Sequence, residues 1–165
     1  MTAERLVGED EHPAEARIDP GMRRFYAIAL LGLLLTGCRE VRVKTYAQGT
    51  TAVQGGNQVL VIRDVHGLEA LGIHAPVRFR SEFVVLLLMG PHQESGWHQV
   101  IESIRASDYR VRIVAFEHPP VDGGEPTKEF RTYTMWIVPN SVYQPGSQVD
   151  VVSPSGDPIA STVLK

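Results

Sequence analysis

The chain has 165 residues, of which 43% are hydrophobic and 21% are charged; this is the composition of one globular domain and excludes a wholly disordered chain. Its formal net charge is −3, and this excludes the strongly basic balance that nucleic-acid binding requires, so we expect no nucleic acid among its partners. Because the sequence holds one cysteine, no intrachain disulfide can form, and the fold must be held by its hydrophobic core.

Residues 1–21 are polar and acidic, unlike the beginning of an export signal. Met22, by contrast, stands directly before two arginines and an apolar run, where a conventional signal would begin. Two interpretations remain open. Either Met22 is the true start and residues 1–21 are a gene-start artefact, or residues 1–21 form a disordered extension.

Residues 22–37 have the order of regions found in a secretory signal. Arg23 and Arg24 precede an apolar run from Phe25 to Leu35, and small residues follow. A helix of these 11 residues would span about 16 Å, roughly half of the hydrocarbon core of a membrane. The run is therefore too short for an ordinary membrane span and is predicted to be a signal peptide.

The sequence Leu35-Thr36-Gly37-Cys38 resembles the lipobox of bacterial lipoproteins, in which an aliphatic and two small residues precede a cysteine. The resemblance implies that a lipoprotein signal peptidase recognises Leu35, Thr36 and Gly37, and that lipid on Cys38 holds the mature chain on a membrane. The alternatives are a signal peptide with an incidental cysteine and a buried helix that ends at Gly37. Arg39 stands where aspartate marks inner-membrane retention, which implies an extracytoplasmic place on the outer membrane in a host that has one.

Residues 38–57 are interpreted as a tether that precedes the folded domain. Val41–Val43 alternates like a short edge strand. Gln48–Thr51 and Gln54–Asn57 have the composition of loops.

Residues 58–165 are predicted to form one β-rich domain, because apolar runs or alternating segments recur between turn residues. The predicted strands are Val59–Ile62, Phe83–Met89, Trp97–Arg105, Tyr109–Ala115, Phe130–Val138, Gln148–Val152 and Ile159–Leu164. The third and fourth of these strands are predicted to form a hairpin. The pattern indicates a mainly β (α+β) fold, an antiparallel sheet or small sandwich with one short helix.

Two segments of this domain carry more specific signals. Asp64 is predicted to cap a helix that runs to Leu71, in which Gly67 is unfavourable by about 1 kcal/mol relative to alanine. Phe83–Met89 is apolar throughout, which predicts a central strand that is covered on both faces. Gly90-Pro91 is predicted to end that strand.

The order of these segments resembles the C-terminal domain of the PrcB-like proteins. The resemblance covers roughly Val59 to Val152 and rests on an apolar strand ending at Gly90, a small-Gly-aromatic step, a hairpin, a proline-rich loop and a strand ending near Pro139. In the family the step reads Thr-Gly-Gly-Tyr, and Ser95-Gly96-Trp97 stands in for its last three places. The resemblance implies a non-catalytic lipoprotein that binds another envelope protein, such as an envelope protease. The alternatives are a lipoprotein that binds a small ligand or has a structural role in the envelope, and a metal-dependent hydrolase.

The sequence contains no nucleophile elbow, zinc-protease motif, phosphate-binding loop or Cys-x-x-Cys pair, so we expect no enzyme activity, cofactor or metal. Two groups nevertheless hold metal-ligand residue types. They are His92, Glu94, His98, Glu102 and His118 for zinc, and Asp122, Glu125 and Glu129 for calcium. We interpret the first group as a polar loop between strands and the second as a solvated acidic loop, because neither has the spacing of a known motif.

Gly90, Ser95, Gly96 and Trp97 form a candidate interaction patch. Exposed aromatic residues beside a loop are typical of protein-binding surfaces. The alternative is structural: aromatic residues in strands usually pack in cores, and the glycine of a Gly-aromatic step serves a bulge or a tight turn.

Overall fold

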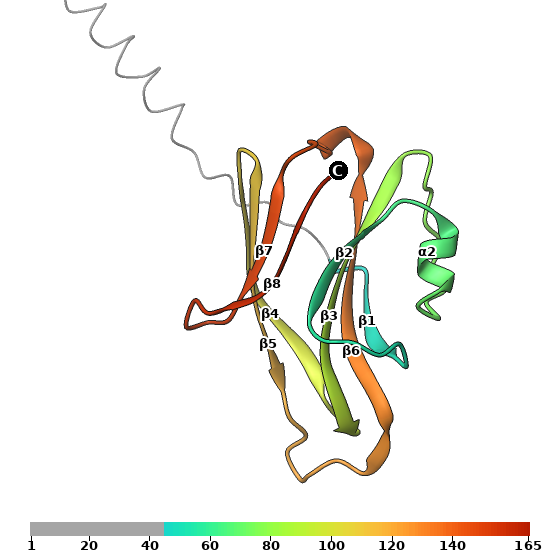
Figure 1. Ribbon diagram of the computed structural model, residues 1–165, viewed down its shortest axis with the longest axis vertical. Coiled ribbons are helices and arrows are strands. Elements are labelled where there is room, and N and C mark those ends of the chain that lie inside the picture. Colours follow the sequence, from blue (N-terminus) through green and yellow to red (C-terminus); the bar gives the residue numbers. More distant parts are fainter. Residues whose placement is uncertain (1–44) are drawn as a thin grey trace, which may run out of the picture. The chain divides into compact units, whose positions relative to one another are not determined.

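The computed structural model describes residues 45–165, and these residues form a β-sandwich with one short α-helix (Figure 1). The mainly β fold predicted from the sequence is thereby confirmed, in its sandwich form. The strands are β1 (Ala47–Thr51), β2 (Gln58–Ile62), β3 (Glu82–Glu94), β4 (His98–Ser107), β5 (Arg110–His118), β6 (Pro126–Pro139), β7 (Gln148–Val152) and β8 (Pro158–Val163). The helices are α2 (Val65–Glu69) and the 3-10 turn η1 (Asn140–Val142).

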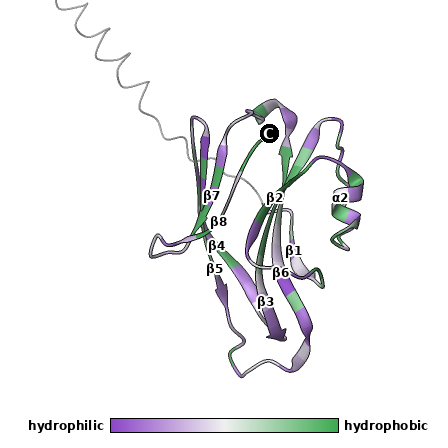
Figure 2. Cartoon of the chain, viewed as in Figure 1, coloured by the Kyte–Doolittle hydropathy of each residue, from purple (hydrophilic) through white to green (hydrophobic). Residues whose placement is uncertain are grey.

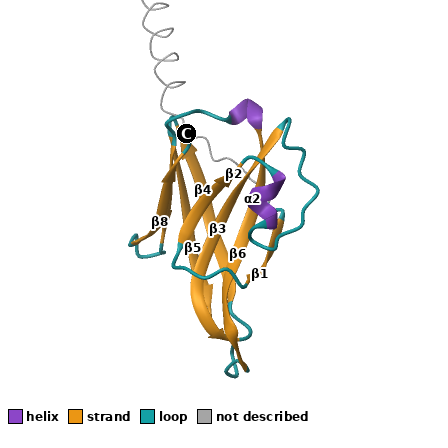
Figure 3. Cartoon of the chain, turned by 45° about the vertical axis from the view of Figure 1, so that its right-hand side comes forward, coloured by secondary structure: helices purple, strands orange, loops and turns teal. Residues whose placement is uncertain are grey.

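Each of the two sheets has four strands, in the orders β1-β6-β3-β2 and β4-β5-β7-β8. All neighbouring strands are antiparallel except β5 and β7, which are parallel. Figure 3 shows α2 on the outer side of the sheet formed by β1, β6, β3 and β2, away from β8. The domain therefore has three layers: sheet, sheet and helix.

Strand β3 lies at the centre of these layers and is covered on both faces, as its apolar sequence predicts. Phe83, Val85 and Leu87 pack into the core between the two sheets. Val84 and Leu86, which point the other way, pack into a second core beneath α2. Figure 2 shows apolar residues on strands of both sheets. In a strand that is buried on both faces, the side chains on either side meet apolar surroundings. Its sequence is therefore a continuous apolar run and does not alternate between apolar and polar residues.

Helix α2 begins as predicted. The Asp64 carboxylate accepts a hydrogen bond of 2.8 Å from the Gly67 backbone N–H, which satisfies one of the free donors at the helix start. The helix ends at Glu69, two residues before the predicted end at Leu71. A Cβ on Gly67 would lie 2.7 Å from Ile62 Cγ2. Gly67 therefore allows α2 to approach β2 closely, and this requirement outweighs its low helix propensity.

The interpretation of Gln48–Thr51 as a loop is wrong. These residues belong to β1, an edge strand that pairs with β6 from Ala47 opposite Met135 to Thr51 opposite Arg131. Backbone pairing makes the strand, because its side chains include no large apolar residue. Val41–Val43, the segment predicted to be the edge strand, lies outside the described residues.

Two strand irregularities also differ from the predictions. Gly90-Pro91 does not end β3, since pairing with β6 resumes at His92 after a register shift. Strand β4 also has a register shift, which follows Ile101. Because this extra residue reverses the alternation, Ile101 and Ile104 pack against the same core, whereas strict alternation would place them on opposite faces.

Candidate functional site

The predicted lipobox residues Leu35, Thr36, Gly37 and Cys38 lie outside the described residues, as does the whole of the predicted signal peptide. Within residues 45–165, no helix has both the length and the apolar character needed to cross a membrane.

The candidate interaction patch is built around the connection between the two sheets. Ser95 and Gly96 link β3 to β4, and Gly96 has a φ of 93°, a conformation that favours glycine. The Ser95 N–H donates to Glu125 O at 2.9 Å, and the Glu125 N–H donates to Ser95 Oγ at 3.0 Å. These bonds join Ser95, Gly96 and Trp97 to the loop before β6, whereas the Gly90 N–H bonds to Asn57 Oδ1. Gly90 is thus held separately, by Asn57, which directly precedes β2.

Trp97 covers a polar network in the interior. Its ring stacks on His92, with ring centroids 4.4 Å apart and an interplanar angle of 11°. His92 Nε2 lies 2.6 Å from Glu117 Oε1, and the two side chains are only 10% and 12% exposed. Thr132 Oγ1 donates to the same carboxylate oxygen at 2.6 Å, and Gln99 Nε2 donates to Thr132 Oγ1 at 2.9 Å. Four strands of both sheets therefore meet in this network.

Of the predicted zinc-ligand residues, His98 and His118 lie together, with their rings stacked and their centroids 5.2 Å apart, whereas His92 meets Glu117, which was not among the predicted ligands. Among residues 45–165, no group of three or more His, Cys, Asp or Glu side chains is arranged to hold a metal ion. Glu125, from the acidic loop, uses its backbone to hold Ser95.

A second candidate site, which the sequence does not predict, is a cavity of about 200 Å³ between the two sheets. It lies at the end of the sandwich near the C-terminus marked in Figure 1. All of its lining residues are apolar. They are Phe83, Val85, Ile104, Ala106, Val111, Ile113, Trp136, Val138, Val142, Val149 and Leu164.

The cavity reaches the surface beside η1, where Val142 is 61% exposed. Trp136 contributes to the wall, and its ring is buried in the core between the sheets. The Trp136 indole N–H is also buried and has no hydrogen-bond partner among the described residues. The site is thus an apolar cavity with an apolar rim at one end of the sandwich.

No family model, curated protein or solved structure matches this chain.

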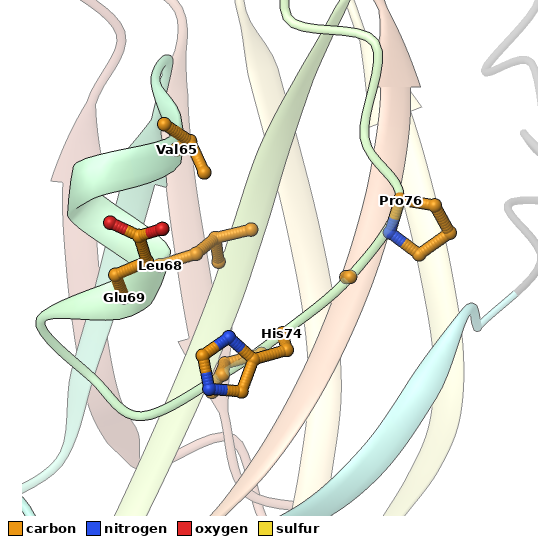
Figure 4. Close-up of a pocket in the computed structure, with 7 residues that line it drawn as sticks. Val65, Leu68, Glu69, His74 and Pro76 are labelled. Carbon is orange, nitrogen blue, oxygen red and sulfur yellow. The ribbon is translucent and has the colours of Figure 1, made fainter.

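A third feature is a groove of about 350 Å³ between α2 and the segment that follows it. Figure 4 shows Leu68 directed from α2 towards the strands, with Glu69 and His74 at the opening. The His66 ring lies 3.3 Å from the Glu69 carboxylate one helical turn away. This polar rim contrasts with the uniformly apolar lining of the cavity between the sheets.

Sequence reasoning missed the cavity because its walls come from β3, β4, β5, β6, β7 and η1. Ala106 and Val111 are opposite each other in the β4–β5 hairpin, and their small side chains face the larger Phe83 and Trp136 across the gap. Small residues near a hairpin turn are also common where a core simply tapers. These small residues therefore indicate a cavity only once the pairing of the two sheets is known.

Proposed function

We propose that this chain is an exported lipoprotein whose β-sandwich is a non-catalytic binding module. In this proposal the chain is cut before Cys38, and lipid on Cys38 holds it on the extracytoplasmic face of a membrane. The observation that carries the proposal is the sequence Leu35-Thr36-Gly37-Cys38, placed directly after an apolar run and containing the one cysteine of the chain. A single acyl chain anchors a protein only marginally, whereas two or more hold it firmly, since each buried CH₂ contributes about 0.8 kcal/mol.

The first candidate ligand is another envelope protein, and the resemblance to PrcB-like proteins makes an envelope protease one such partner. Its docking surface would be the patch of Ser95, Gly96 and Trp97. Two observations support this surface: Trp97 is only partly buried, and stacking on His92 holds its ring in one orientation. A rigid aromatic side chain loses little entropy on binding and is typical of protein interfaces.

The second candidate ligand is a small apolar molecule, which the cavity between the sheets favours. Ligand sites are usually concave and mostly apolar, and this cavity has an apolar lining and opens to the surface. The two candidates occupy different sites, so they can be tested separately.

The anchor is tested by growing cells with radiolabelled palmitate and comparing the wild-type chain with Cys38→Ser. We expect label and membrane sedimentation for the wild-type chain, and neither label nor signal-peptide cleavage for Cys38→Ser. Arg39→Lys, one residue further along, is the matched control and should be labelled normally. A wild-type chain without label would refute the anchor, as would a Cys38→Ser chain that keeps it.

The protein partner is tested with a benzophenone amino acid in place of Trp97, activated by light in cells. We expect one dominant protein adduct. Tyr109, which is 63% exposed at the β4–β5 turn, provides the control position and should give none. Equal adducts at the two positions would indicate random collisions and would contradict the proposed docking surface.

A further inference from the structure

The cavity between the sheets has room for one small apolar group. Its volume is about 200 Å³. Apolar cavities of about 150 Å³ in other proteins stay dry and bind benzene, so this one can take a benzene-sized group or a few more methylene groups. Because the lining is almost entirely apolar, burial of a flexible hydrocarbon would be favourable over most of the wall.

The rim of the cavity argues against a polypeptide as the occupant. A peptide carries an N–H and a C=O at each residue, and these groups need hydrogen-bond partners wherever water is excluded. Three lining residues that are not fully buried, Ala106, Val111 and Val142, have no polar side-chain atoms. A hydrocarbon chain needs no such partners.

The first described residues, Thr45 and Tyr46, lie near the same end of β6 as the cavity. The Tyr46 N–H donates to Met135 O, and Thr45 and Ile137 line one hollow of the surface. Trp136 and Val138, which alternate with Met135 and Ile137 along β6, line the cavity.

The length of the tether limits how far this end can be from the lipid. Six residues, 39–44, lie between Cys38 and Thr45 in the sequence, so seven residue-to-residue steps connect the two. A fully extended chain covers at most about 3.5 Å per residue, so Cys38 lies within about 25 Å of Thr45. This end of the sandwich therefore stays close to the membrane that the lipid enters.

We infer that the cavity between the sheets takes the end of an acyl chain supplied by the membrane. This inference rests on the proposed function, because the anchor is what keeps the opening close to lipid. The bound chain would lie against Phe83 and Trp136, with its head group outside the rim at Val142. No bond is made or broken, so the ligand is held by burial alone.

The two tryptophans of the chain provide the test, because Trp136 lines the cavity and Trp97 lies in the connection between β3 and β4. The lipidated full chain is reconstituted in phosphatidylcholine vesicles and titrated with ω-bromodecanoic acid, whose terminal bromine quenches indole fluorescence at short range. In Trp97→Phe, which reports Trp136, we expect saturable quenching. In Trp136→Phe, which reports Trp97, we expect none.

Ala106→Phe, made in the Trp97→Phe background, fills part of the cavity and should weaken the binding about tenfold, the effect of displacing two methylene groups. The matched control is Ala52→Phe, since Ala52 is exposed and lies outside the cavity. Near-ultraviolet circular dichroism shows whether each variant is folded. Equal quenching of both tryptophans, or quenching that Ala106→Phe leaves unchanged, overturns the inference.

Two further measurements separate this inference from the proposed function. Flotation of the vesicles reports the anchor: a chain that floats without quenching refutes the acyl ligand alone, and a chain that is quenched but does not float refutes the anchor. A benzophenone amino acid in place of Val142 reports the occupant in cells. A lipid adduct supports the inference, and a dominant protein adduct overturns it.

Discussion

Replacing Arg131 with methionine should destabilise the fold well beyond the usual effect of a surface substitution. Arg131 is 1% exposed. Its Nε donates to Val53 O at 2.7 Å and its Nη1 donates to Gly56 O at 2.9 Å, which ties the loop after β1 to β6. Burial lowers the pKa of the Arg131 guanidinium, so part of its interaction energy is offset by desolvation.

The magnitude follows from these two bonds. Hydrogen bonds from a charged donor contribute about 1.5–3 kcal/mol each, or about 3–6 kcal/mol together. Desolvation of the guanidinium and rehydration of Gly56 O, which belongs to an exposed residue, reduce this total. We expect Arg131→Met to lower the free energy of unfolding by about 2–3 kcal/mol.

Urea unfolding of the purified chain measures this change, and hydrogen exchange should show faster exchange in residues 52–57. The matched control is Arg110→Met. Arg110 is 63% exposed and lies 2.7 Å from the Asp150 carboxylate, so its loss should change the free energy by at most about 1 kcal/mol. If the two variants are equally stable, or if exchange in residues 52–57 is unchanged, the anchoring role of Arg131 is wrong.

Two further substitutions test close contacts of glycine. Gly67→Ala should lower the free energy of unfolding by up to about 2 kcal/mol, because overpacking against Ile62 costs about 1–3 kcal/mol and the helix propensity of alanine returns about 1 kcal/mol; a higher urea midpoint would contradict this. Gly124→Ala should also destabilise by about 1–3 kcal/mol, because its Cβ would overlap Ser95 O. Hydrogen exchange should then be faster at the Ser95 and Glu125 N–H groups, and unchanged protection at both would refute the close contact.

Local patterns predict the parts of this fold that depend on side-chain burial. Phe83–Met89 is buried on both faces and has the sequence of such a strand, and Asp64 has both the residue type and the position of a helix cap. Gln148–Val152 was predicted with the observed bounds. Its parallel pairing with β5 was not predicted, because the apolar pattern of a strand does not indicate the direction of the strand beside it.

Other features depend on partners distant in the sequence. β1 owes its pairing to β6, which no pattern within Gln48–Thr51 reveals. The contact between His92 and Glu117 joins residues 25 apart, and the cavity needs the spacing of two sheets. The candidate patch at Gly90, Ser95, Gly96 and Trp97 could be proposed because its sequence signal is local, whereas the network beneath Trp97 could not be predicted.

The pairing of β1 with β6 has a consequence for the order of assembly. Ala47 lies opposite Met135 and Thr51 opposite Arg131, so β1, the first described strand, pairs within residues 45–165 with a strand far later in the sequence. In a chain exported from its N-terminus, β1 crosses the membrane long before β6. Under the proposed export, β1 would therefore stay unpaired until β6 has followed it, and the sandwich would close over β1 late in assembly.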